Sequence, residues 1–315
     1  MNLRMNIYRW VLAARLRTLP LSFSGVLLGV IVGVHNNISR GMSSSICVAI
    51  LVLLTAILLQ VLSNFANDYG DSLTGLDNEK RVGPKRAVQQ GLISLKEMKT
   101  AIMIISVFAC ITGISFILLS FGASYSDIVS FIILGGVSIL AAITYTVGLI
   151  YGYKGLGDVS VFIFFGLVSV LGAEYVMSHM ISTYSYLLAV NAGLMSILVL
   201  NVNNLRDYES DAMQGKRSLV VIYGLRFGKT YHFILFLLTI FCSFIYLNTH
   251  IVEHGTTKAL ILNVCLALCI TPLYKSVKFC VKKDNNGGIL DPFLKKTSIS
   301  SAIINLYFSL FLLFI

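Results

Sequence analysis

Two rows of carboxylate and amide side chains stand out in a chain that is otherwise strongly apolar. The first aspartate row contains Asn64, Asp68 and Asp71, spaced by four and three residues at the end of the apolar run 46–66. On an α-helix this spacing places the three side chains on one face, about one turn apart. Hard oxygen donors of this kind suit magnesium, which often bridges them to substrate phosphates. The first row therefore predicts a divalent-cation site.

A second aspartate row repeats this pattern in the other half of the chain. It contains Asn203, Asp207 and Asp211, spaced by four residues each. Basic residues follow both rows, in the segments 83–86 and 215–217. Two rows that face each other could hold a metal-bound diphosphate between them.

The basic residues that follow the rows suit the remaining phosphate oxygens. We expect Arg86 and Arg217 to make bidentate contacts, because a guanidinium presents two parallel donors. Lys216 would act as a point charge. Together with a metal ion they would neutralise the charge that develops on a departing diphosphate.

The composition indicates an integral membrane protein. The 315 residues are 57% hydrophobic and only 12% charged, whereas soluble domains are about 25% charged. A helical membrane span needs about 20 apolar residues. Nine segments fit this length, at about 19–35, 44–66, 100–121, 128–150, 158–178, 183–203, 231–249, 257–274 and 298–315. The segment 1–18 mixes arginines with apolar residues and predicts an amphipathic helix on the membrane surface, so that 19–315 would form a single transmembrane domain.

The basic residues predict the orientation of these spans. The N-terminal segment and the loops after the second, fourth, sixth and eighth spans carry 22 of the 24 lysines and arginines, and only Arg40 and Lys258 fall elsewhere. Basic loops face the cytoplasm, so the N-terminus and both aspartate rows are predicted to do the same. The net charge of +10 is explained by this topology, and no nucleic-acid partner is expected.

A membrane protein built around a metal-bound diphosphate most simply uses a lipid diphosphate. Its apolar tail would lie among the spans, and ionisation would leave an allylic cation for an electron-rich acceptor.

The sequence shows no nucleophilic triad or zinc motif, and its five histidines, which include His232, are interpreted as solvated or interfacial. Asp158 allows two interpretations, a cap for the fifth span or a substrate-facing group. Glu174 lies inside that span, where an ionisable group suggests a function, but its role stays open.

Several segments resemble a known family. Asn67-Asp-Tyr-Gly-Asp71 and Asp207-x-x-x-Asp211 resemble the two aspartate motifs of the UbiA superfamily of intramembrane prenyltransferases. The resemblance is closer still to its 1,4-dihydroxy-2-naphthoate polyprenyltransferase branch, of menaquinone biosynthesis. It is carried by the segments 14–20, 145–146, 152–158, 162–166, 201–207 and 215–217. Gly75 stands where the superfamily motif has a third aspartate, and the role of the next one, Asp77, stays open.

The resemblance implies nine transmembrane helices in an all-α fold around a central cavity, with a cytoplasmic N-terminus in the cell inner membrane. It also implies transfer of a polyprenyl group from polyprenyl diphosphate to 1,4-dihydroxy-2-naphthoate, with loss of CO2 and diphosphate. The catalytic residues would be Asp68, Asp71, Asp207, Asp211, Lys154 and Tyr145, and the four aspartates would bind Mg²⁺. The substrate-binding residues would be Asn64, Asn67, Arg86, Asn203, Asp158, Lys216, Arg217 and Arg15.

Two alternatives remain at this stage. The first is a prenyltransferase of the same superfamily that acts on another acceptor, such as 4-hydroxybenzoate; the segment 152–158 and the Gly75-x-Asp77 spacing favour the naphthoate. The second is a membrane transporter, because internal repeats are common in transporters. The acidic groups gather at one end, however, and the opposite loops offer no matching gate.

Overall fold

The computed structural model describes residues 3–36, 42–75, 82–251 and 256–314. Within these ranges the chain is helical, without β-strands. The longer helices are α1 (Leu3–Ala14), α2 (Leu19–Asn36), α3 (Met42–Leu73), α4 (Leu95–Phe121), α5 (Tyr125–Thr144), α8 (Ser185–Arg206), α10 (Leu219–Ile251), α11 (Thr256–Cys280) and α12 (Asp291–Phe314). The shorter elements are η1 (Tyr151–Lys154), α6 (Gly157–Phe162), η2 (Ile163–Gly172), α7 (Ala173–Ser178), α9 (Tyr208–Met213) and η4 (Gly287–Leu290).

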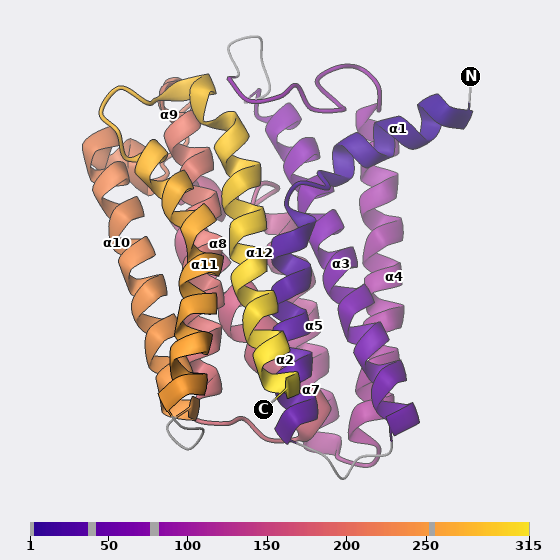
Figure 1. Ribbon diagram of the computed structural model, residues 1–315. Coiled ribbons are helices and arrows are strands. Elements are labelled where there is room, and N and C mark those ends of the chain that lie inside the picture. Colours follow the sequence, from indigo (N-terminus) through magenta and orange to yellow (C-terminus); the bar gives the residue numbers. More distant parts are fainter. Residues whose placement is uncertain (1–2, 37–41, 76–81, 252–255, 315) are drawn as a thin grey trace.

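Nine helical segments of the described chain are long and apolar enough to cross a membrane, as predicted. One of them combines α6, η2 and α7 into a continuous span, 157–178. Its middle part, η2, is a π-helix of ten residues. The membrane-spanning helices run side by side in one bundle (Figure 1).

Both aspartate rows lie at the same end of this bundle, which we call the mouth. The C-terminal end of α3 reaches it, and so do α9 and the helix α1, which lies across it (Figure 1). The C-terminus lies toward the opposite end (Figure 1). The expected convergence of the two rows at one end is therefore seen in the fold.

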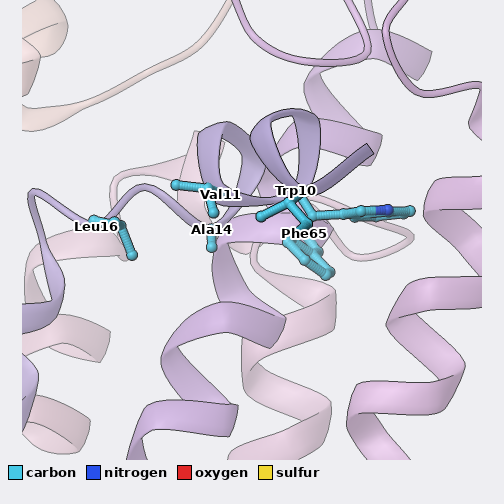
Figure 2. A pocket seen from close by; sticks show the side chains of 6 residues that line it. Trp10, Val11, Ala14, Leu16 and Phe65 are labelled. Atoms are coloured by element: carbon cyan, nitrogen blue, oxygen red, sulfur yellow. The ribbon is translucent and has the colours of Figure 1, made fainter. Parts of the chain in front are cut away.

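The helix α1 has an apolar underside. Figure 2 shows Trp10, Val11, Ala14 and Leu16 around a groove whose base is Phe65 of α3. The Trp10 and Phe65 ring centroids are 5.6 Å apart. Apolar residues on one side of a surface helix are typical of helices that lie in the membrane interface.

Several spans differ from their predicted limits, among them those of α3, α5 and α10. The helix α3 continues to Leu73, beyond the predicted end at 66, so both aspartates of the first row are helical. The helix α5 ends at Thr144 rather than 150, because Gly148 and Ile150 adopt left-handed backbone conformations that break it. The helix α10 begins at Leu219 rather than 231 and is kinked at Gly224, whose φ is +85°. Arg226 and Lys229 interrupt the apolar residues of the first turns, which hid this early beginning from a pattern based on apolar residues.

Close packing of α3 against the turn after α5 fixes the first row. Any side chain at Gly70 would collide with the backbone and side chain of Thr146. The Thr146 hydroxyl, in turn, donates a hydrogen bond of 2.9 Å to the Ala66 carbonyl. Thr146 thus ties the turn to the helix segment that carries Asp68 and Asp71.

The predicted orientation can be tested with alkaline phosphatase, which is active only outside the cytoplasm. Fusions after Gly91 and Gly215, near the mouth, are expected to be inactive. Fusions after Ala123 and Ser182, at the opposite end, are expected to be active, because the basic loops stay inside. The reverse pattern in cell-based phosphatase assays would mean that the mouth faces outward.

Candidate active site

The first aspartate row is buried at the mouth. The Asp68 and Asp71 side chains belong to residues that are only 1% and 7% exposed. Asp71 forms an ion pair with the Arg86 guanidinium and accepts a hydrogen bond from the Tyr153 hydroxyl. Arg86 also donates to the backbone carbonyl of Asn67. Arg86, which follows α3 in the chain, therefore neutralises one of the two carboxylates of the first row.

The spacing of Asn64 predicted a place in the cation site, but its amide bonds to the protein instead. Its Nδ2 donates a 2.9 Å hydrogen bond to the Ala14 carbonyl, at the end of α1. Its Oδ1 accepts from Gln60 Nε2 at 3.3 Å. Asn64 therefore holds the turn between α1 and α2 against α3, next to Arg15, which has a left-handed backbone with φ of 51°.

The second aspartate row is paired with cations from its own segment. Arg206 grips Asp207 with two hydrogen bonds of 2.7 Å, from Nε and Nη2. The same Nη2 donates to Asn203 Oδ1 at 2.7 Å. Asp211 forms a 2.7 Å ion pair with Lys216, and its backbone carbonyl accepts from the Lys216 amide at 3.0 Å.

Arg206 is the centre of a buried network that the sequence patterns did not reveal. Its side chain is fully buried, and its Nη1 donates to Asp291 Oδ1 at 2.6 Å. Arg17 donates to the same oxygen at 3.2 Å. Gly83 lies against the guanidinium, where a Cβ would come within 2.7 Å of Nη2. Arg206 thereby joins the start of α2, the loop after α3, the second row and the start of α12.

Tyr153 connects the two rows and was also missed. Its hydroxyl bonds Asp71 of the first row, while the Lys216 ammonium lies 5.9 Å from its ring centroid. Its backbone carbonyl accepts from the Arg217 amide at 2.8 Å. The family resemblance could have indicated Tyr153, because this residue belongs to the segment 152–158. No helical spacing pattern includes it, so spacing alone could not.

The carboxylates of the two rows influence each other electrostatically. Burial raises the pKa of the Asp211 carboxyl above its usual value, and the Lys216 ammonium opposes this increase. The carboxylates of Asp207 and Asp71 raise that pKa further, so the two rows are within electrostatic reach of each other. Negative charge gathered in a buried site is costly unless positive charge accompanies it.

The donor set fits magnesium in one particular manner. Among the described residues, no three acidic, histidine or cysteine side chains are close enough to enclose an ion by themselves. Magnesium, however, commonly takes only one or two carboxylates and completes its shell with water and substrate phosphates. The four buried aspartates suit an ion that arrives with a diphosphate and bridges it to the rows.

Tyr145 and Asp158, two of the predicted acceptor residues, make contacts within the protein. Tyr145 packs against Gly152 and Gly157, which leave room for its ring and hydroxyl. Burial and the neighbouring Asp158 carboxylate raise the pKa of Tyr145. Asp158 is buried and accepts from the Tyr231 hydroxyl at 3.2 Å. The N-cap position of α6 is Leu156, which makes no side-chain cap, and Asp158 lies in the first turn of the helix.

Lys154, the third predicted acceptor residue, and Arg217, a predicted phosphate contact, are exposed. Lys154 lies between the two rows in the chain, and Arg217 follows the second row. Asp77 lies outside the described residues. His232 is fully buried beside Asn201, with Nδ1 and Oδ1 3.1 Å apart, so its interpretation as a solvated residue was wrong.

The Arg206 network yields a prediction about stability. Arg206→Met would leave Asp207 without its bidentate partner in a buried setting, which costs about 3–5 kcal/mol. We expect a marked loss of folded protein after heating, measured by size-exclusion chromatography in detergent. Arg217→Met, at an exposed arginine in the same region, should behave like the parent protein. Equal stability of the two variants would contradict the role assigned to Arg206.

Comparison with proteins of known sequence places the chain among curated enzymes. It is 41% identical to a 1,4-dihydroxy-2-naphthoate octaprenyltransferase of Haemophilus influenzae over 254 residues, which is 80% of each chain. It is 39% identical to the Escherichia coli protein of the same name over 234 residues, 74% of each chain.

Solved structures share the fold. A UbiA homologue from Aeropyrum pernix aligns with a TM-score of 0.66 at 14% identity, covering 93% of this chain and 97% of that one. A UbiA homologue from Archaeoglobus fulgidus, solved with DMAPP and Mg²⁺, aligns with a TM-score of 0.60 at 15% identity, covering 98% and 99%. These alignments confirm the all-helical membrane fold.

The family itself follows from the sequence match. The profile of the UbiA prenyltransferase family matches residues 23–288, which include both aspartate rows and the segment between them. The protein is accordingly a prenyltransferase enzyme of the membrane, and the transport alternative is discarded. The chain belongs to the UbiA prenyltransferase family.

Proposed function

We propose that this protein transfers a polyprenyl group from a polyprenyl diphosphate to 1,4-dihydroxy-2-naphthoate, with release of CO2 and diphosphate. The product would be demethylmenaquinone. The observation that carries this proposal is the meeting of two buried aspartate rows at one end of an apolar bundle. Four curated relatives that are 34–41% identical bear the name of a naphthoate octaprenyltransferase, which supports the acceptor.

The four aspartates of the two rows would hold Mg²⁺ together with the donor diphosphate. Magnesium would supply positive charge that neutralises the leaving diphosphate. Three of these aspartates, Asp71, Asp207 and Asp211, already have cationic partners. Arg86 and Lys216 would contact phosphate oxygens, because their side chains remain 11% and 15% exposed at the mouth.

The amide residues and the exposed cations would complete the donor site. Asn203 keeps Arg206 oriented toward Asp207. The Asn67 backbone orients Arg86 in the same way. Arg15 and Arg217, on the segments around the mouth, would add positive charge for the incoming diphosphate.

The acceptor would lie beside Tyr145 and Asp158, between the two rows. A tyrosine ring can stabilise a nearby cation through its π face, and the allylic cation needs such shelter from water. Lys154, on the same connection, would attract the naphthoate carboxylate. These residues would hold the acceptor near the point at which the diphosphate departs.

The proposed setting is the cell inner membrane, with the mouth facing the cytoplasm. The distribution of basic residues supports this orientation. The segment 1–18 would lie on the membrane surface, with residues 19–315 as the transmembrane domain. A lipid diphosphate would then meet the mouth from the inner leaflet, with its head group at the level of the two rows.

Charge removal at the first row tests the metal-diphosphate site. Asp68→Asn keeps the size of the side chain and removes one negative charge. Turnover of donor and naphthoate in Mg²⁺ is expected to fall by a factor of about 100 or more. Asp207→Asn should also lose turnover, and it can still accept a hydrogen bond from Arg206. Asp284→Asn, at an exposed aspartate, is the matched control. Full activity of both row variants in inserted protein would rule out this site.

The acceptor is tested by competition. Membranes that contain the protein are supplied with Mg²⁺, one long-chain diphosphate, 1,4-dihydroxy-2-naphthoate and 4-hydroxybenzoate. Product masses should show prenylation of the naphthoate with loss of CO2. Prenylation of 4-hydroxybenzoate alone would overturn the assignment of the acceptor while preserving the enzyme class.

A further inference from the structure

Six lysines gather where the end of α11 meets the start of α12. The helix α12 begins at the mouth and runs toward the C-terminus at the opposite end (Figure 1). Within the described residues, none of these lysines takes part in an ion pair. A surface that carries charges of one sign attracts ligands of the opposite sign. The six lysines, which we call the lysine patch, are all exposed: Lys275, Lys278, Lys282, Lys283, Lys295 and Lys296.

Two side-chain contacts hold the ends of α11 and α12 together. The hydroxyl oxygens of Ser276 and Thr297 are 2.7 Å apart, and both residues are buried. One turn nearer the mouth, the Phe279 and Phe293 rings stack with centroids 3.9 Å apart and planes at 8°. The last turns of α11 therefore lie beside the first turns of α12.

These contacts bring lysines of the two helices onto neighbouring turns. Lys275 precedes Ser276 in the chain, and Lys296 precedes Thr297. The Lys296 ammonium also lies 4.4 Å from the centroid of the Phe293 ring, which is a cation–π contact. The lysine patch is thus one surface built from two helices.

The backbone beneath the patch is held by a buried lysine of α10. The Lys229 ammonium donates hydrogen bonds of 2.6 and 2.8 Å to the carbonyls of Lys282 and Lys283. Asn285 Nδ2 donates to the Phe279 carbonyl at 2.8 Å. The turn after α11 therefore has a fixed course, while the side chains of its own two lysines stay exposed.

Acidic residues do little to offset the charge of the patch. Asp284 and Asp291 are the acidic residues of the segment 256–314. Asp291 already accepts hydrogen bonds from Arg17 and Arg206. Asp284 is then the one carboxylate of this segment left to balance six lysines.

The patch lies at the ends of two membrane spans, because α11 and α12 are both long and apolar enough to cross a bilayer. Lysines near the ends of such helices extend their ammonium groups to the level of the lipid head groups. Tyr274, Ile289 and Ile299 are exposed near the lysines, and the Lys278 ammonium lies 6.0 Å from the Tyr274 ring centroid. Cations beside exposed apolar side chains suit an anion that carries apolar chains.

Other cations at the mouth have a different task. Arg86 pairs with Asp71, and Lys216 pairs with Asp211, so these cations serve the two aspartate rows. Membrane topology accounts for the presence of basic residues on one side. It does not require that six of them be collected around stacked aromatic rings on two packed helices.

We propose that the lysine patch binds the phosphate head group of an anionic phospholipid of the bilayer. The phosphate would lie between the lysines of α11 and those of α12, and the acyl chains would follow the exposed apolar side chains into the membrane. Basic surfaces between membrane helices bind anionic head groups in this manner. Asp291 and Lys295 are one turn apart at the start of α12, so the bound lipid also steadies the helix end that holds Arg206.

Lipid retention in native mass spectrometry tests the proposal. The protein is released from micelles that contain equal amounts of phosphatidylglycerol and phosphatidylcholine, and we expect it to retain the anionic lipid. The double variant Lys275→Gln, Lys296→Gln should retain phosphatidylglycerol about tenfold less or weaker still, because each lysine contributes to the attraction. Lys275→Arg combined with Lys296→Arg keeps both charges and should retain it like the parent protein.

The matched control removes the same charge elsewhere at the mouth. Lys96 and Lys99 are exposed on the first turns of α4, and the double variant Lys96→Gln, Lys99→Gln should retain phosphatidylglycerol like the parent. An equal loss in this control, or no loss in the patch variant, would overturn the proposal. Displacement of the lipid by excess inorganic diphosphate would also overturn it, since the patch would then be a site for soluble phosphates.

Heat stability gives a second measurement. Phosphatidylglycerol should raise the temperature at which the parent protein aggregates in detergent, whereas phosphatidylcholine should not. The rise should be smaller for the Lys275→Gln, Lys296→Gln variant, because the lipid no longer holds the start of α12. An equal rise for both proteins would contradict the proposed site. Neither measurement uses turnover, so the result is independent of the proposed function.

Discussion

Negative charge buried at one end of an apolar bundle is the constraint on which the rest of this structure depends. A carboxylate in such a place needs a cation or hydrogen-bond donors close by. The chain supplies Arg86 for Asp71, Arg206 for Asp207 and Lys216 for Asp211. Arg206 is fully buried and engages its partners with its whole guanidinium, so it belongs to the permanent structure. Arg86 and Lys216 lie at the edge of the mouth, where an anionic substrate can approach them.

This requirement explains why segments far apart in the chain meet at the mouth. Gly83 follows the first row in the chain but lies against Arg206, which pairs with Asp207 of the second row. Tyr153 comes from the connection between the halves and contacts both rows. Asp291, at the start of α12, gives Arg206 its additional carboxylate. The mouth is therefore one unit built from both halves, although the sequence reads as two separate repeats.

The sequence predicted what depends on local periodicity. The spacing of Asp68 and Asp71 placed them on one helix face, and the apolar segments located the spans, because both patterns follow from helical geometry. The partners of Arg206 and the position of Tyr153 depend on contacts between distant segments, which no local pattern contains. Asn64 shares the spacing of the aspartates, but its amide found a closer acceptor in the Ala14 carbonyl. Spacing places a residue on a face, and only packing decides what that face touches.

The opposite end of the bundle holds a buried carboxylate that is met by neutral donors. Glu174 is fully buried there and accepts 2.9 Å hydrogen bonds from Asn36 Nδ2 and the Ser182 amide. The short Asn36 side chain and the Ser182 backbone have little freedom to move away. Their hydrogen bonds therefore hold α2 and the loop before α8 against α7. At the mouth, two of the aspartates are instead met by long basic side chains that retain solvent access. Fixed neutral donors therefore hold one end of the bundle together, and basic side chains with solvent access surround the aspartates at the other.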